Sequence, residues 1–109
     1  MKLVFDVNKY IEKIKKNDNY FHTFINNENL AAGVLVLQPG EEDTQEPHDS
    51  DEVYFVLRGD GFLKIKDMDY PISENKMYFV GKKIEHFFHG NSKRNSFIIL
   101  SKTSSKIDS

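Results

Sequence analysis

Apolar residues near the start of the chain recur at helical spacing. Asp6 or Asn8 precedes them as a candidate N-cap, and a polar run over 15–19 follows. The apolar positions are Val7, Tyr10, Ile11 and Ile14. Steps of three and four residues place such side chains on one face of a helix. We therefore expect a short amphipathic helix that packs on the outside of the remaining structure.

Beyond residue 20 the pattern changes to short apolar runs separated by turn-forming residues. Arg58-Gly59-Asp60-Gly61 is typical of a hairpin, and Asp60 and Asp69 are expected on hairpin turns. Closely spaced strands with almost no helix between them predict an all-β fold, an antiparallel sandwich or barrel. The expected strands are 20–25, 30–38, 52–57, 62–66, 76–80, 85–89 and 95–102.

The chain has 109 residues, which is enough for one domain with one core. We expect an N-terminal strand and helix over 1–19, a β-domain over 20–102 and a frayed polar tail over 103–109.

Composition excludes several classes of function. The chain has no Cys, so disulfides, thiolate-bound zinc and cysteine nucleophiles are excluded. The net charge is -2 and both signs are mixed, which does not give the basic stripe that nucleic-acid binding needs. Apolar runs are too short to span a bilayer or to form a signal-peptide core. We expect a cytoplasmic protein that binds neither nucleic acid nor membrane.

The segment between Gly40 and Gly61 contains a candidate metal site. Glu46 and His48 lie two residues apart, so both side chains leave the same face of an extended chain. Glu52 follows four residues after His48. The polar residues between them predict a turn that folds the chain back and places Glu52 beside His48. Imidazole and carboxylates that converge in this way are transition-metal ligands.

These residues resemble the first sequence motif of the cupin family. That motif has two glycines that bracket two His and one Glu, and Gly40, Glu46, His48, Glu52 and Gly59 stand at its positions. Glu46 replaces the first His. The segment 80–88 resembles the second cupin motif. The two motifs cover about half of the chain, from Gly40 to Gly90.

The resemblance implies a fold and a ligand set. The fold is an antiparallel double-stranded β-helix, a jelly-roll barrel, with the short helix outside it. The implied metal ligands are Glu46, His48, Glu52 and His86, and the implied cofactor is a divalent transition metal such as Fe, Mn, Ni or Zn. His89 lies three residues beyond His86, so in a strand it faces the opposite way, toward the surface.

Tyr54 is the candidate catalytic residue. It shares the parity of Glu52 along the expected strand, so its hydroxyl is expected inside, where it would orient a ligand. Cupins include isomerases, dioxygenases and regulatory binding proteins, so two functions remain open. One is a metal-dependent enzyme acting on a small polar, oxygen-rich substrate. The other is a non-catalytic module that binds a small molecule or metal. A homodimer is expected in either case.

Overall fold

The computed structural model describes residues 2–17, 20–41, 43 and 49–102. It contains one helix and eight strands within these ranges, and every strand pairing is antiparallel. The predicted all-β architecture with a short N-terminal helix is therefore confirmed. The elements are α1 (Val7–Asn17), β1 (Phe21–Asn26), β2 (Ala31–Leu37), β3 (Glu52–Arg58), β4 (Phe62–Ile65), β5 (Met68–Pro71), β6 (Met77–Val80), β7 (His86–His89) and β8 (Asn95–Ser101).

Helix α1 begins at an N-cap and packs on the sheet. The Lys9 amide donates to the Asp6 carboxylate at 3.4 Å and to the Asp6 carbonyl at 3.1 Å. Ile14 is buried against Val34 and Val36 of β2. The amphipathic helix predicted from sequence is confirmed. Helices of the length and apolarity that a membrane crossing needs do not occur in the described ranges.

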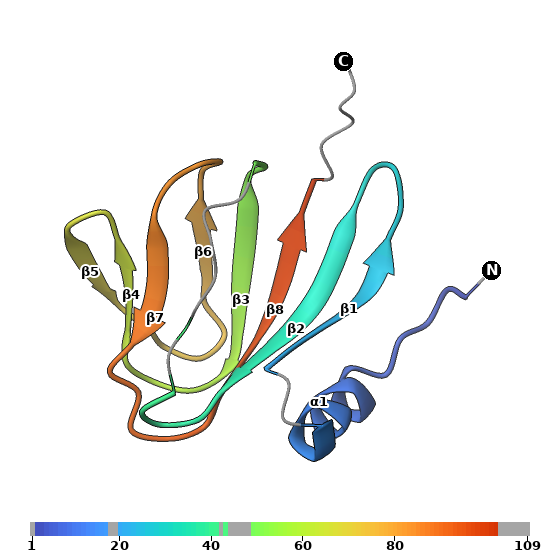
Figure 1. Cartoon of the computed structure of the whole chain (residues 1–109), viewed down its shortest axis with the longest axis horizontal. Coiled ribbons are helices and arrows are strands. Elements are labelled where there is room, and N and C mark those ends of the chain that lie inside the picture. Colours follow the sequence, from blue (N-terminus) through green and yellow to red (C-terminus); the bar gives the residue numbers. More distant parts are fainter. Residues whose placement is uncertain (1, 18–19, 42, 44–48, 103–109) are drawn as a thin grey trace.

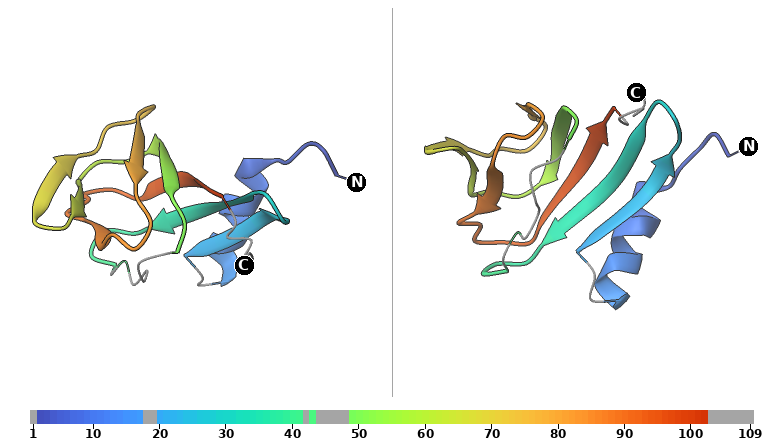
Figure 2. Two further views of the ribbon diagram at one scale, coloured as in Figure 1. Left: turned by 90° about the horizontal axis from the view of Figure 1, so that it is seen from above. Right: turned by 45° about the horizontal axis from the view of Figure 1, so that its top comes forward.

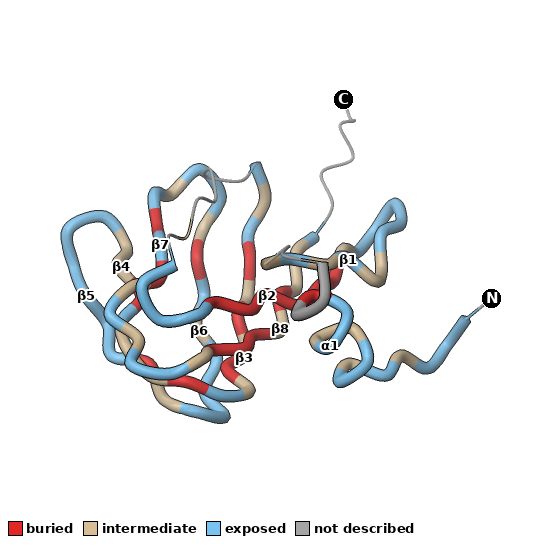
Figure 3. The backbone as a smooth tube through the Cα atoms, turned by 60° about the horizontal axis from the view of Figure 1, so that its bottom comes forward, coloured by how far each residue is buried: buried red, intermediate tan, exposed pale blue. Residues whose placement is uncertain are grey.

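The strands form two antiparallel sheets (Figures 1 and 2). One has five strands in the order β1-β2-β8-β3-β6, and the other has three in the order β5-β4-β7. The main core lies between the sheets, and Figure 3 shows that the buried segments gather on the central strands. Its fully or nearly fully buried members include Leu35, Tyr54, Leu63, Phe88 and Phe97.

Strand β5 was not predicted. Its sequence Met68-Asp69-Tyr70-Pro71 contains an Asp and a Pro, both of which are rare in strands, and all four residues are exposed. It forms because its backbone pairs with β4 at the edge of the small sheet. The expectation that Asp69 lies on a turn is wrong for this reason. Asp69 lies in β5, opposite Lys64.

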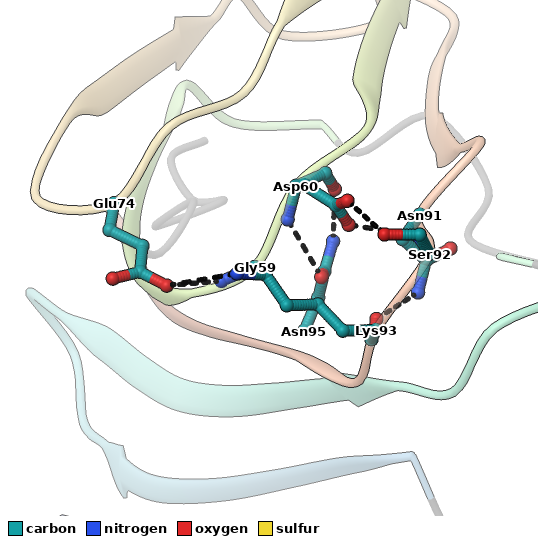
Figure 4. Close-up of polar contacts among 7 residues, drawn as sticks. All are labelled: Gly59, Asp60, Glu74, Asn91, Ser92, Lys93 and Asn95. Atoms are coloured by element: carbon teal, nitrogen blue, oxygen red, sulfur yellow. Dashed lines mark hydrogen bonds and ion pairs between the residues drawn. The ribbon is translucent and has the colours of Figure 1, made fainter.

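A polar cluster joins the β3–β4 connection to the loop before β8 (Figure 4). The buried Asn95 side chain accepts from the Asp60 amide at 3.0 Å and donates to the Asp60 carbonyl at 2.7 Å. The Asp60 carboxylate accepts from both the amide and the hydroxyl of Ser92, and these hydrogen bonds lower the pKa of Asp60. Gly59 donates its amide to Glu74 at 3.2 Å. The cluster fixes the connection that leaves β3.

Candidate metal centre

Alternation along β3 and β7 directs three polar side chains into the space between the sheets. Glu52 and Tyr54 of β3 are buried, whereas Val53 and Phe55 are only partly buried. On β7, His86 is buried and the next residue is exposed. Side chains two residues apart share a face, so each strand presents its polar groups to the opposite sheet. The predicted inward direction of Glu52 and Tyr54 is confirmed.

The three side chains meet at hydrogen-bond distance. The Tyr54 hydroxyl lies 2.8 Å from Glu52 Oε1 and 2.8 Å from His86 Nε2. Glu52 Oε1 and His86 Nε2 are 3.5 Å apart. Glu52 is 5% exposed and His86 is 6% exposed. A carboxylate and an imidazole thus converge in a place sheltered from solvent.

The backbone selects the tautomer of His86. Its Nδ1 atom lies 2.8 Å from the Ile84 carbonyl oxygen, which can only accept a hydrogen bond, so Nδ1 carries a proton. Nε2 is the nitrogen that faces Glu52 and Tyr54. A histidine that donates through one nitrogen to a carbonyl and presents the other is the usual arrangement of a metal ligand.

The donor set fits a cation. The single proton of the Tyr54 hydroxyl can be donated to Glu52 or to an unprotonated His86, but not to both at once. A proton on Nε2 removes this competition, and so does a cation held jointly by Nε2 and Oε1. Imidazole nitrogen and carboxylate oxygen together suit Fe, Mn, Ni and Zn.

Electrostatics favour positive charge at His86. Burial acts to lower the pKa of His86. The hydrogen bonds to Glu52 and to the Ile84 carbonyl act to raise it, as do the negative charges of Glu52 and Asp43, and together they outweigh burial. The pKa of His86 is therefore raised above its ordinary value of 6.5. The site attracts a proton, and the same charges attract a metal ion.

Protein freed of metal by a chelator is expected to lose stability as pH rises above about 6.5. Because the pKa of His86 is raised in the folded state, its protonation stabilises the fold fully below the ordinary value. That contribution is lost as pH rises through the raised pKa. Thermal unfolding of wild type and His86→Gln across this range tests the prediction. Equal pH dependence in the two proteins would contradict it.

Of the four predicted ligands, the structure brings Glu52 and His86 together. Glu46 and His48 lie outside the described residues. Within the described ranges, no group of three or more His, Asp or Glu side chains is placed to hold a metal. His89 lies partly exposed on the other face of β7, as its position in the sequence predicted. Its Nε2 atom lies 2.8 Å from Asp69 Oδ1.

Asp43 is a residue near the site that sequence reasoning missed. Its carboxylate accepts a hydrogen bond from the Phe88 amide at 2.9 Å, and its charge acts on His86. A cavity of about 410 Å³ beside β7 is lined by Asp43 together with Phe87, Phe88 and His89, among others. In the sequence Asp43 belongs to an acidic run over 41–43, so spacing alone does not distinguish it.

Comparison with known proteins identifies the family of this chain. The family model described as the cupin domain matches residues 33–101. An uncharacterized protein of Streptomyces coelicolor is 30% identical over 73 residues, which are 67% of this chain and 70% of that protein.

Solved structures with the same fold include a bacterial enzyme and an archaeal protein. The RmlC-like cupin family protein of Methanocaldococcus jannaschii has a double-stranded β-helix fold. It aligns with a TM-score of 0.71 and 18% identity over 79% of this chain and 81% of its own. The DMSP lyase DddQ of Ruegeria pomeroyi aligns with a TM-score of 0.68 and 14% identity over 86% of this chain and 51% of its own. The match over residues 33–101 includes β3, β7 and the residues that meet between them, and the chain belongs to the cupin domain family.

Proposed function

We propose that the chain binds a divalent transition metal, Fe, Mn, Ni or Zn, between its two sheets. The ligands in this proposal are Glu46, His48, Glu52 and His86. The observation that supports it most is the buried approach of Glu52 Oε1 to His86 Nε2 at 3.5 Å, with the His86 tautomer set by the Ile84 carbonyl. Two ligands held in this way by rigid strands need little reorganisation to receive an ion.

We further propose that the site acts on a small polar, oxygen-rich substrate, in an isomerase, a dioxygenase or a related enzyme. A bound metal would act as a Lewis acid on a substrate oxygen. Tyr54 is the group of this chain that would orient the substrate, because its hydroxyl lies between Glu52 and His86. Phe88 packs edge-on against Tyr54 with ring centroids 5.1 Å apart, which holds the phenol ring in place.

Metal analysis of the protein purified without added metal tests the first proposal. Wild type is expected to retain a transition metal, and His48→Ala is expected to lose most of it. Glu46→Gln is expected to lose occupancy as well if the carboxylate coordinates. Equal and negligible occupancy in wild type and His48→Ala, including after incubation with each of the four metals, would reject the metal site.

Tyr54→Phe is expected to keep the metal and to weaken binding of an oxygen-rich ligand. Nε2 of His86 has one lone pair, so the Tyr54 hydroxyl competes with a cation for it. Removing the hydroxyl removes the competitor and the orienting group together. Metal titration of the apoprotein and thermal shift with small sugars and keto acids measure the two effects. A loss of metal affinity in Tyr54→Phe would contradict the competition.

We propose that the chain forms a homodimer through the edge of the larger sheet. Strand β6 is one of the two edge strands of this sheet, and its outward residues Met77 and Phe79 are 60% and 63% exposed. Strand pairing places them in two apolar rows across the outer face. The rows are Phe79, Val53, Leu100 and Met77, Phe55, Ile98. Exposed apolar residues gathered at a sheet edge are typical of a protein–protein contact.

Met77→Lys is expected to shift the protein from dimer to monomer, because the charge would be desolvated at the contact. Met68→Lys is the matched control. Met68 is equally exposed, at 60%, but lies on β5 at the edge of the smaller sheet. Sedimentation of both variants measures the mass. A dimer that survives Met77→Lys, or a wild type that is monomeric, contradicts the proposed interface.

A further inference from the structure

A second cavity lies on the outer side of the larger sheet, where helix α1 covers it. Its volume is about 360 Å³. The helix contributes residues of its first two turns, and the sheet and the loop before β8 contribute the rest. The lining residues are Asn8, Ile11, Glu12, Arg58, Arg94 and Ser96. This cavity shares no lining residue with the proposed metal centre.

A β-bulge brings Arg58 to this cavity. Strict alternation from Glu52 and Val56 would direct Arg58 inward. The pairing of β3 with β8 shifts after Val56, so that Arg58 lies opposite Ser96 instead of Asn95. Ser96 also pairs with Val36, whose side chain is buried under α1. The bulge therefore places a guanidinium group on the outer face beside the helix.

The second guanidinium group has an unsatisfied donor. Arg94 Nε is buried and has no hydrogen-bond partner among the described residues. Within the same ranges, neither Arg58 nor Arg94 forms an ion pair, although Glu12 lines the cavity with them. Buried donors in folded proteins are almost always satisfied, and a bound water or ion is one explanation of an exception.

From these observations we propose that the cavity binds a small oxyanion, a phosphate or carboxylate group. Two guanidinium groups offer forked donors that match such oxygens, and they outweigh the single negative charge of Glu12. Ser96 is only 5% exposed, and it adds a hydroxyl group to the lining of the cavity. Asn8 lies in the first turn of α1, where the helix dipole is positive. The charge of the oxyanion compensates the two guanidinium groups, which form no ion pair within the described residues.

Titration of the 109-residue chain with inorganic phosphate and, separately, acetate tests this site. Calorimetry or NMR at constant ionic strength is expected to give saturable binding of at least one anion to wild type. Arg58→Gln and Arg94→Gln are each expected to weaken it by about tenfold or more. Arg94→Lys keeps the charge but loses the fork, and it is expected to restore only part of the affinity. Tighter binding of phosphate than acetate, or the reverse, identifies the group.

Lys76→Gln is the matched control, because it removes one positive charge from an exposed position outside the cavity. It is expected to bind the anion as wild type does. No saturable binding of either anion, or equal weakening in Lys76→Gln and Arg94→Gln, would overturn the proposal. Metal content is measured in all variants and is expected to be unchanged in Arg58→Gln and Arg94→Gln. The anion site and the metal site can thus fail independently.

Discussion

His86→Ala is expected to lower the affinity for transition metal on the order of 100-fold or more. Loss of a group that merely supports a ligand costs 10–100-fold, and here the proposed ligand itself is removed. The substitution would also leave the Glu52 carboxylate buried without the imidazole that lies 3.5 Å from it. Metal titration of the apoprotein, followed by elemental analysis of the dialysed complex, measures the loss.

His89→Ala is the control, because it removes an imidazole from the same strand. His89 lies on the opposite face of β7 and contacts Asp69 on the surface. It is expected to keep wild-type affinity. Equal affinity in wild type and His86→Ala would contradict the proposed centre. If His86→Ala fails to fold, His86→Asn offers a smaller change at the same position, and its far-ultraviolet circular dichroism shows whether the fold is retained.

Gly59→Ala is expected to destabilise the fold by on the order of 3 kcal/mol. Gly59 has φ of +137°, which a residue with a side chain rarely adopts, and an added Cβ would overlap the Asn95 side chain. Asn95 cannot move freely, because it bonds both the amide and the carbonyl of Asp60. For a domain of this size the melting temperature is expected to fall by roughly 10 °C or more.

Gly40→Ala separates backbone strain from overlap. Gly40 also has positive φ, at +79°, but no atom of the described residues lies within 4 Å of an added Cβ. Its substitution is expected to lower the free energy of unfolding by about 1 kcal/mol, because only the backbone conformation becomes unfavourable. Chemical denaturation of both variants gives the two free energies of unfolding. Similar losses at the two glycines would show that the contact with Asn95 has no role.

Local pattern was sufficient to predict the helix and most strands. The spacing of Val7, Ile11 and Ile14 predicted α1, and alternation predicted that Glu52 and Tyr54 face inward. The pattern failed for β5, which is stabilised by pairing with β4 and not by its own sequence. Tertiary pairing overrides local preference most easily at a sheet edge, where the side chains are not packed.

The candidate site was only partly predictable from the chain itself. Glu52 follows from alternation along β3, but the position of His86 came from resemblance, because spacing alone does not show that β7 faces β3. The hydrogen bond of Nδ1 to the Ile84 carbonyl and the contribution of Asp43 depend on loops whose geometry has no sequence signature. Long-range approach of this kind is visible only in three dimensions.

The extra residue in β3 makes the chain unequally sensitive to deletions. Leu57 lies between the pairs Val56–Phe97 and Arg58–Ser96 and has no partner on β8. Removing it would restore a regular ladder while leaving Arg58 opposite Ser96. Removing one residue from 53–55 would instead shift the register by one residue, so that either Glu52 or the residues after the deletion would face away from the core. Natural variation in length should therefore be tolerated at one point of this strand and selected against a few residues earlier.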